Sequence, residues 1–231
     1  MKKPYPWGSI LSGIGLHYLA YMFMQTLCLL AETRRGPMLS DRMHEWIPAH
    51  REYSVFNATI WLPGVIAFIL LLSILRPEKC VNYLRVGAAV SFCRGIFIYM
   101  TSLGPPQAML IDTPPAMLSL TMNDITWPLL LRQWFPFDVF YGGSGLSAAY
   151  LTQDLFFSGH TATTVLFLFV LGTRDVWFWP ALVFHLFTVG LLFLTHEHYT
   201  IDILGAYFIT YALYVFFEKR RLLFPLNPAD N

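Results

Sequence analysis

Val176 to Thr195 of this chain reads VWFWPALVFHLFTVGLLFLT, twenty consecutive residues without Asp, Glu, Lys or Arg. A run of this length is about what a helix needs to cross roughly 30 Å of hydrocarbon. Its one ionisable residue is His185, in the middle of the run. We therefore expect Val176 to Thr195 to form a transmembrane helix, and this stretch sets the class of fold.

Other apolar runs of the same character occur on both sides of this one. The whole chain is 56% hydrophobic and only 13% charged, which leaves too little polar surface for a water-facing globule. The sequence predicts an all-α, polytopic membrane protein with a six-transmembrane-helix bundle, forming a single membrane domain over residues 1–231. The predicted spans are Ile10 to Ala31, Ser54 to Leu75, Val81 to Leu103, Phe157 to Gly172, Val176 to Thr195 and Ile201 to Phe217.

Basic residues predict the orientation of the bundle. Six spans return both termini to one side, and that side should be cytoplasmic because it carries most of the basic clusters. The first apolar run lacks a small-residue cleavage site, so we expect it to be retained. The basic residues on the predicted cytoplasmic side are Lys2, Lys3, Arg76, Lys79, Arg85, Arg174, Lys219, Arg220 and Arg221.

Charge and cysteine content exclude some classes of function. A net charge of +1 gives no reason to propose nucleic acid as a partner. Cys28, Cys80 and Cys93 are odd in number and scattered, so they predict neither a disulfide framework nor a metal-binding cluster. The expected partners are the membrane and lipid substrates, and a homo-oligomer is neither required nor excluded.

Two segments outside the predicted spans are long enough to matter, and both fall on the non-cytoplasmic side: Glu32 to Tyr53 and Gly104 to Phe156. Within the second, Ile125 to Tyr141 mixes prolines with five Trp and Phe residues. This mixture favours a broken helix at the level of the lipid headgroups. We expect that helix to be a lipid-facing cap over the site.

Two histidines stand at the starts of predicted spans. His160 lies in DLFFSGHT, residues 154–161, at the start of the fourth span, and His198 lies in HYTID, residues 198–202, at the start of the sixth. The two crossings between them carry the chain to the cytoplasmic side and back. We therefore expect both imidazoles to meet at the non-cytoplasmic face.

The spacing of His198 and Asp202 predicts a nucleophile. Residues four apart are one helical turn apart, so the carboxylate can accept a bond from one imidazole nitrogen and leave the other facing outward. Such an imidazole can attack phosphorus and form a phosphohistidine. His160 would then protonate the departing oxygen and later deprotonate the incoming hydroxyl.

Other residues could hold the phosphate. Ser158 and Gly159 open a predicted helix, whose free N–H groups and dipole favour an anion. Arg94 lies inside the third span, where a charge is costly, so it binds phosphate or pairs with a carboxylate. His17 and His185 are interpreted as packing or interhelical hydrogen-bonding residues. The adjacent spacing of residues 196–198 does not fit a metal site, and no metal or cofactor is expected.

These motifs resemble the sphingomyelin synthase branch of the type 2 phosphatidic acid phosphatase superfamily. The family's third-span motif is similar to Arg94, Tyr99, Thr101 and Leu103, and its early luminal motif to Pro37, Leu39 and Asp41. Its two catalytic patterns, D-x-x-F-S-G-H-T and H-Y-T-x-D, match Asp154, Phe157, Ser158, Gly159, His160 and Thr161, and then His198, Tyr199, Thr200 and Asp202.

The resemblance implies roles for individual residues. His198 would be the nucleophile, Asp202 its orienting partner and His160 the acid and base, on a luminal, exoplasmic or periplasmic face. Phospho-headgroup transfer between lipids would proceed without a metal. The residues assigned to substrate or phosphate binding are Arg94, Tyr99, Asp154, Ser158, Gly159, Thr161 and Tyr199.

The chain departs from the family at Thr152-Gln153, where Cys-Gly is usual. Leu191-Leu192 replaces the Ser-Arg of the phosphatase branches, which favours the synthase-like branch. The leading hypothesis is transfer of a phosphocholine-like headgroup from a glycerophospholipid to ceramide, diacylglycerol or a similar alcohol. The alternative is a lipid phosphatase or phospholipase C-like hydrolase with the same site. A third hypothesis is a non-catalytic lipid-binding or transport protein.

Overall fold

The structure is a computed structural model that describes residues 5–112, 120–135 and 151–225. Within these residues the protein is helical and contains no strand. The elements are α1 (Trp7–Glu32), α2 (Arg42–Trp46), η1 (Arg51–Ser54), η2 (Asn57–Trp61), α3 (Leu62–Leu75), α4 (Pro77–Thr101), α5 (Met109–Asp112), η3 (Met122–Asp124), α6 (Trp127–Trp134), α7 (Gly159–Leu171), α8 (Phe178–Thr195) and α9 (Thr200–Lys219).

Five helical segments of the described chain are long and apolar enough to cross a membrane. This confirms the predicted all-α, polytopic class, and the observed segments agree with the predicted spans to within a few residues. The five segments are Trp7–Glu32, Arg51–Leu75, Pro77–Thr101, Phe178–Thr195 and Thr200–Lys219.

The fourth predicted span is the exception. α7 is apolar but has only 13 residues, so at 1.5 Å per residue it is roughly 20 Å long. It begins later than predicted because Ser158 caps its N-terminus, and it ends at Gly172, whose positive φ of 71° suits glycine. The predicted count of six full spans is therefore approximate, with five full-length helices and one short one.

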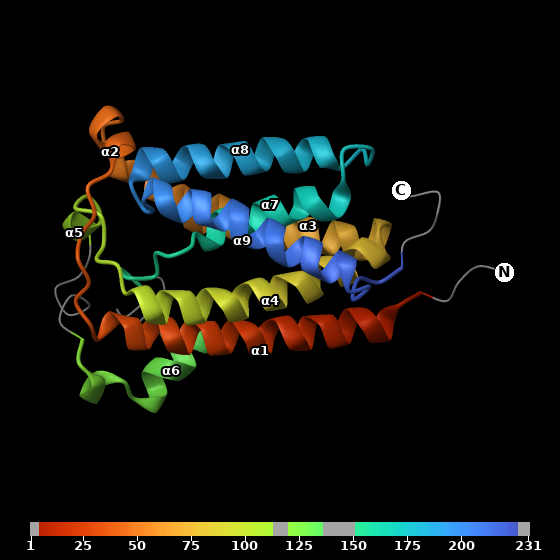
Figure 1. Cartoon of the computed structure of the whole chain (residues 1–231), viewed down its shortest axis with the longest axis horizontal. Coiled ribbons are helices and arrows are strands. Elements are labelled where there is room, and N and C mark those ends of the chain that lie inside the picture. The colour runs from red at the N-terminus through yellow and green to blue at the C-terminus, as the bar shows by residue number, and fades with distance from the viewer. Residues whose placement is uncertain (1–4, 113–119, 136–150, 226–231) are drawn as a thin grey trace.

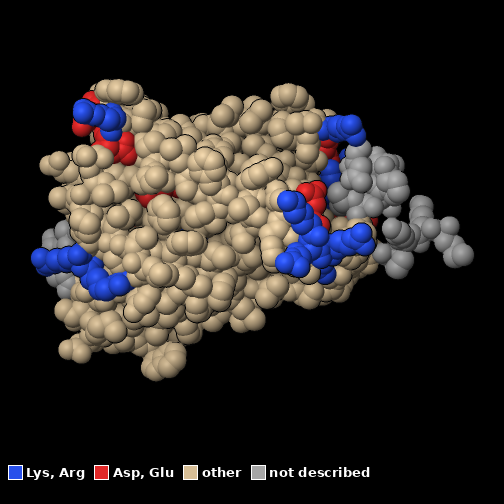
Figure 2. Space-filling view, viewed as in Figure 1, with Lys and Arg blue, Asp and Glu red and all other residues tan. Residues whose placement is uncertain are grey.

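The helices form an elongated bundle (Figure 1). α1 packs along α4, and α7 packs against α4, α8 and α9. α1 begins and α9 ends at the same end of the bundle, as six crossings require. We call this the terminal end, and the opposite end, where α1 ends and α9 begins, the histidine end. On the face that Figure 2 shows, charged side chains gather at both ends and the middle is almost uncharged, as expected of a bilayer-spanning belt.

Histidines inside the bundle bond between helices. His17 of α1 contacts the Leu84 carbonyl through Nδ1 at 3.3 Å. His185 of α8 contacts Thr164 Oγ1 at 2.8 Å through Nδ1 and the Tyr207 hydroxyl at 2.6 Å through Nε2, which links α7, α8 and α9. The predicted interhelical hydrogen-bonding role of both histidines is confirmed.

The predicted cap over the site is not where we expected it. α6 packs alongside α1: the Tyr18 hydroxyl donates to the Trp134 carbonyl, and Trp134 Nε1 donates to Thr26 Oγ1. Both partners lie well inside α1, so the aromatic residues of α6 cover the flank of α1 and not the histidines. The remainder of the predicted segment, residues 136–141, lies outside the described residues.

Candidate active site

His160 and His198 meet at the histidine end of the bundle. Their ring centroids are 5.8 Å apart, with the ring planes inclined at 65°. His160 is the second residue of α7, and His198 lies in the short turn between α8 and α9. The predicted encounter of two residues distant in sequence is thus present in the fold.

Asp202 faces His198, but not as two residues of one helix. His198 precedes α9, and Asp202 sits in the first turn, where its Oδ2 accepts the Tyr199 amide at 2.9 Å. This capping bond turns the carboxylate back toward the imidazole, leaving 3.4 Å between His198 Nδ1 and Asp202 Oδ2. Within the described part of the chain, neither His198 Nδ1 nor Asp202 Oδ1 has a hydrogen-bond partner, so the pair is in contact but not hydrogen-bonded.

A strap formed by residues 36–50 holds the turn that carries His198. Asp41 accepts the Met43 amide and the Thr200 amide, at 2.9 and 2.5 Å, and so caps both α2 and α9. His44 Nε2 donates to the His198 carbonyl at 3.1 Å. The His44 ring stacks on the His196 ring, with the two centroids 4.0 Å apart. The strap therefore fixes the backbone on both sides of the imidazole.

Electrostatics keep the His198 ring neutral. Burial, followed by the Arg94 guanidinium, lowers the pKa of His198 to about 3. Burial alone would raise the pKa of Asp41, but the bonds from Thr200 and Met43 outweigh it and hold that pKa below its ordinary value. A neutral imidazole is the form that can act as a nucleophile.

Arg94 is paired with a carboxylate, one of its two predicted roles. Its Nη2 lies 2.5 Å from Asp154 Oδ1 and donates to the Asp154 carbonyl at 3.1 Å. Its Nε donates to the Phe157 carbonyl at 2.7 Å. Arg94 is 5% exposed, so it binds the segment leading into α7 from inside the protein.

Gly159 lets this guanidinium approach the first turn of α7. A Cβ at Gly159 would lie 3.0 Å from Arg94 Cζ and 3.1 Å from its Nε. We expect Gly159→Ala to push the guanidinium from its acceptors, lowering the free energy of unfolding by about 1–3 kcal/mol and reducing turnover. Thermal unfolding in detergent and an activity assay would measure both effects.

Gly190→Ala is the matched control, because a Cβ at this α8 position meets nothing within 4 Å. It should leave activity unchanged and the midpoint of unfolding equal or slightly raised, as alanine favours helix. Equal losses in the two variants would show that the close approach of Arg94 to Gly159 has no special importance.

The other predicted binding residues lie in three environments. Ser158 accepts the Thr161 amide at 3.3 Å, so both residues build the start of α7. The buried Tyr199 hydroxyl donates to the Gly104 carbonyl and accepts the Leu39 amide, which ties two loops together. Tyr99 is exposed on α4, and its ring lies under the Arg34 guanidinium at 4.3 Å. These contacts bring Ser158 and Thr161 to the histidines, and they place Tyr99 on the surface.

Glu32 explains the unusual Thr152-Gln153 pair. This buried carboxylate accepts Thr152 Oγ1 and the Gln153 amide, both at 2.6 Å. Gln153 Oε1 in turn accepts the Gly36 amide at 3.2 Å. The pair therefore fastens the segment before α7 to α1 and to the strap, a role that the sequence motifs did not reveal.

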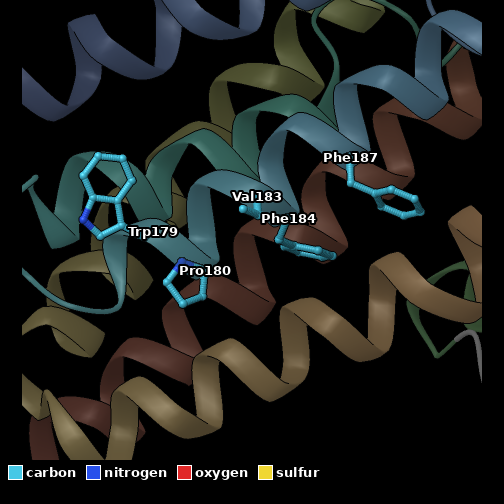
Figure 3. A pocket seen from close by; sticks show the side chains of 5 residues that line it. All are labelled: Trp179, Pro180, Val183, Phe184 and Phe187. Carbon is cyan, nitrogen blue, oxygen red and sulfur yellow. The ribbon is translucent and has the colours of Figure 1, made fainter.

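An open apolar groove runs along α8, apart from this chemistry (Figure 3). None of its lining residues is ionisable, and its face is of the kind that acyl chains cover in a bilayer. Its lining residues are Trp179, Pro180, Val183, Phe184 and Phe187.

The paired histidines, the carboxylate and the capped helix start form the candidate site, and the part of the chain that contains them resembles a known class. Residues 153–220 match the family described as PAP2 superfamily C-terminal. This range contains His160, His198 and Asp202 within one matched region.

Individual relatives match parts of the chain as well. Phosphatidylcholine:ceramide cholinephosphotransferase 2 of Homo sapiens is 37% identical over 75 residues, which are 30% of this chain and 20% of the relative. Phosphatidylcholine:ceramide cholinephosphotransferase 1 of Homo sapiens is 29% identical over 127 residues, 52% of this chain and 29% of the relative. The chain thus matches less than a third of the length of either relative. These matches confirm the predicted resemblance to the sphingomyelin synthase-like part of the superfamily.

Proposed function

We propose that this protein transfers a phosphorylated headgroup, phosphocholine or a close analogue, from a glycerophospholipid to ceramide, diacylglycerol or a similar lipid alcohol. The observation that carries the proposal is the meeting of His160 and His198 at 5.8 Å between ring centroids, with Asp202 beside the second ring. The names of the matched relatives support the choice of headgroup and acceptor.

The chemistry divides into two displacements. Asp202 lies beside Nδ1 of His198, so Nε2 carries the lone pair that attacks phosphorus. The P–O bond to the donor lipid breaks as protonated His160 gives its proton to the leaving oxygen. The acceptor hydroxyl then loses its proton to His160 and attacks phosphorus, breaking the P–N bond and restoring both rings.

The test uses purified protein in liposomes containing headgroup-labelled phosphatidylcholine, with and without ceramide or diacylglycerol. Label that appears in a new lipid only when the alcohol is added supports transfer. Free labelled phosphocholine, independent of the alcohol, would replace the proposal by a hydrolase. No product across a panel of headgroups would reject both activities.

The low pKa of His198 predicts the acid side of the pH profile. Because this imidazole stays neutral until the pH approaches about 3, kcat/KM should show no loss from its protonation near the ordinary value of 6.5. The same shift makes folding pH-dependent. Below pH 6.5 the unfolded chain binds a proton at His198, whereas the folded protein does not until the pH nears 3. The free energy of unfolding that is present above pH 6.5 therefore decreases as the pH drops toward 3.

Thermal midpoints must therefore be measured beside the rates, and only pH values at which the protein remains folded should be compared. The contrary result is a loss of kcat/KM on the acid side near pH 6.5 that Asp202→Asn shifts, in protein that is still folded. This result would show that the pKa of His198 is ordinary.

A further inference from the structure

We propose that Trp61 is a further substrate-binding residue, whose indole N–H donates a hydrogen bond to an oxygen of the phosphoryl group between the two histidines. This inference deepens the proposed function and rests on it for the identity of the lipid. It concerns a residue in the middle of an apolar run, where the sequence showed no catalytic pattern.

Trp61 is in contact with the catalytic pair. Its ring centroid lies 4.3 Å from that of His160, with the planes inclined at 59°. His160 in turn lies 5.8 Å from His198. The indole therefore lies directly beside the ring that we assign as acid and base.

The local backbone presents this side chain in an unusual way. Trp61 ends η2, a π-helical segment over Asn57–Trp61 that leads directly into α3. Pro63, the second residue of α3, has no N–H to continue the helical ladder. A wider π turn rotates the side chains around the helix axis, and such turns are frequent at functional sites.

The nitrogen of Trp61 is an unused donor. Trp61 Nε1 is buried from solvent and has no hydrogen-bond partner among the residues that the structure describes. A buried donor left unpaired is costly, and buried indole N–H groups usually find a partner. Trp134, by contrast, donates its Nε1 to Thr26 Oγ1 at 3.0 Å. An acceptor supplied by the substrate would satisfy the Trp61 donor.

The chemistry of the site indicates what that acceptor is. Arg94 already directs Nε and Nη2 to carbonyl groups and to the Asp154 carboxylate. A phosphoryl group therefore cannot use those donors without breaking this arrangement. An indole N–H is a neutral donor, so it needs no counter-charge. It can donate to an anionic oxygen in a site with little water.

The test replaces the donor and keeps the ring. Trp61→Phe should lower kcat/KM by about tenfold or more, the effect of losing one hydrogen bond to a charged group. Orthovanadate, a phosphate analogue, should raise the thermal midpoint of the wild-type protein, and the same shift in Trp61→Phe should need about tenfold more of it. Trp179→Phe, in the α8 groove, is the matched control and should behave as wild type.

A second variant separates the donor from packing. Replacing Trp61 by 3-benzothienylalanine substitutes sulfur for N–H at nearly constant shape, so it should reproduce the loss seen in Trp61→Phe even if the smaller ring also disturbs folding. Wild-type vanadate response in this variant, or no vanadate response in the wild type, would overturn the inference. A Trp61-dependent vanadate response in protein without lipid turnover would instead reject the proposed function and retain the anion site.

Discussion

His198→Ala is expected to lower headgroup transfer by at least about a thousandfold, because removal of the proposed nucleophile would eliminate the covalent route. The variant should still fold, since His198 Nδ1 bonds to none of the described residues and the His198 carbonyl remains available to His44. Initial rates in liposomes, normalised to folded protein, measure the loss. Activity close to wild type would show that another group attacks phosphorus.

A surface histidine of the neighbouring strap supplies the control. The His50 side chain is 45% exposed, pairs with Glu52 and lies against the Tyr53 ring, so His50→Ala should change the rate by less than about twofold. His160→Ala adds a positive test: with p-nitrophenyl phosphocholine, whose leaving group needs no proton, it should accumulate a phosphocholine adduct that mass spectrometry locates on His198. An adduct on another residue would contradict the assignment.

Arg94→Met should destabilise the protein by roughly 3 kcal/mol or more, the scale expected when one partner of a buried ion pair is removed. The substitution leaves the Asp154 carboxylate without its cation and frees the Phe157 carbonyl from its donor. The segment before His160 then loses its anchor. We expect both a lower midpoint of thermal unfolding in detergent and a large loss of turnover.

Two further variants separate charge from position. Arg94→Met combined with Asp154→Asn removes the unpaired charge, so it should recover part of the stability but little activity. Arg94→Lys keeps the charge but cannot bond several acceptors with one planar group. Its stability and activity should lie between those of the wild-type protein and Arg94→Met. Full activity in Arg94→Lys would show that the charge alone matters and that the bond to Phe157 does not.

The class of fold could be predicted from hydropathy, because each long apolar run requires its own helix in a bilayer. The meeting of His160 and His198 also followed, because the two crossings between them return the chain to the same end. What the spacing could not predict is the way Asp202 reaches His198. The sequence suggested one helical turn, whereas the structure uses the cap of α9 and the strap.

Other features depend on contacts that no local pattern records. Glu32 and Gln153 are far apart in the sequence, and only the folded chain shows that one fastens the other. Trp61 is one aromatic residue among many, and its role depends on the turn before Pro63. α6 has the composition of an interfacial helix, but its tyrosine and threonine partners on α1 decide which surface it covers.

The shortness of α7 has a consequence for the choice of acceptor. Because this helix starts inward of the neighbouring ends of α8 and α9 (Figure 1), its first residues lie below the rim of the bundle. A reacting group there is sheltered from bulk solvent while its flanks face the apolar medium, in which lipid alcohols are concentrated and free water is scarce. Under the proposed function, the local supply of hydroxyl groups would favour transfer to a membrane-dissolved alcohol over hydrolysis, before any side chain discriminates between the two.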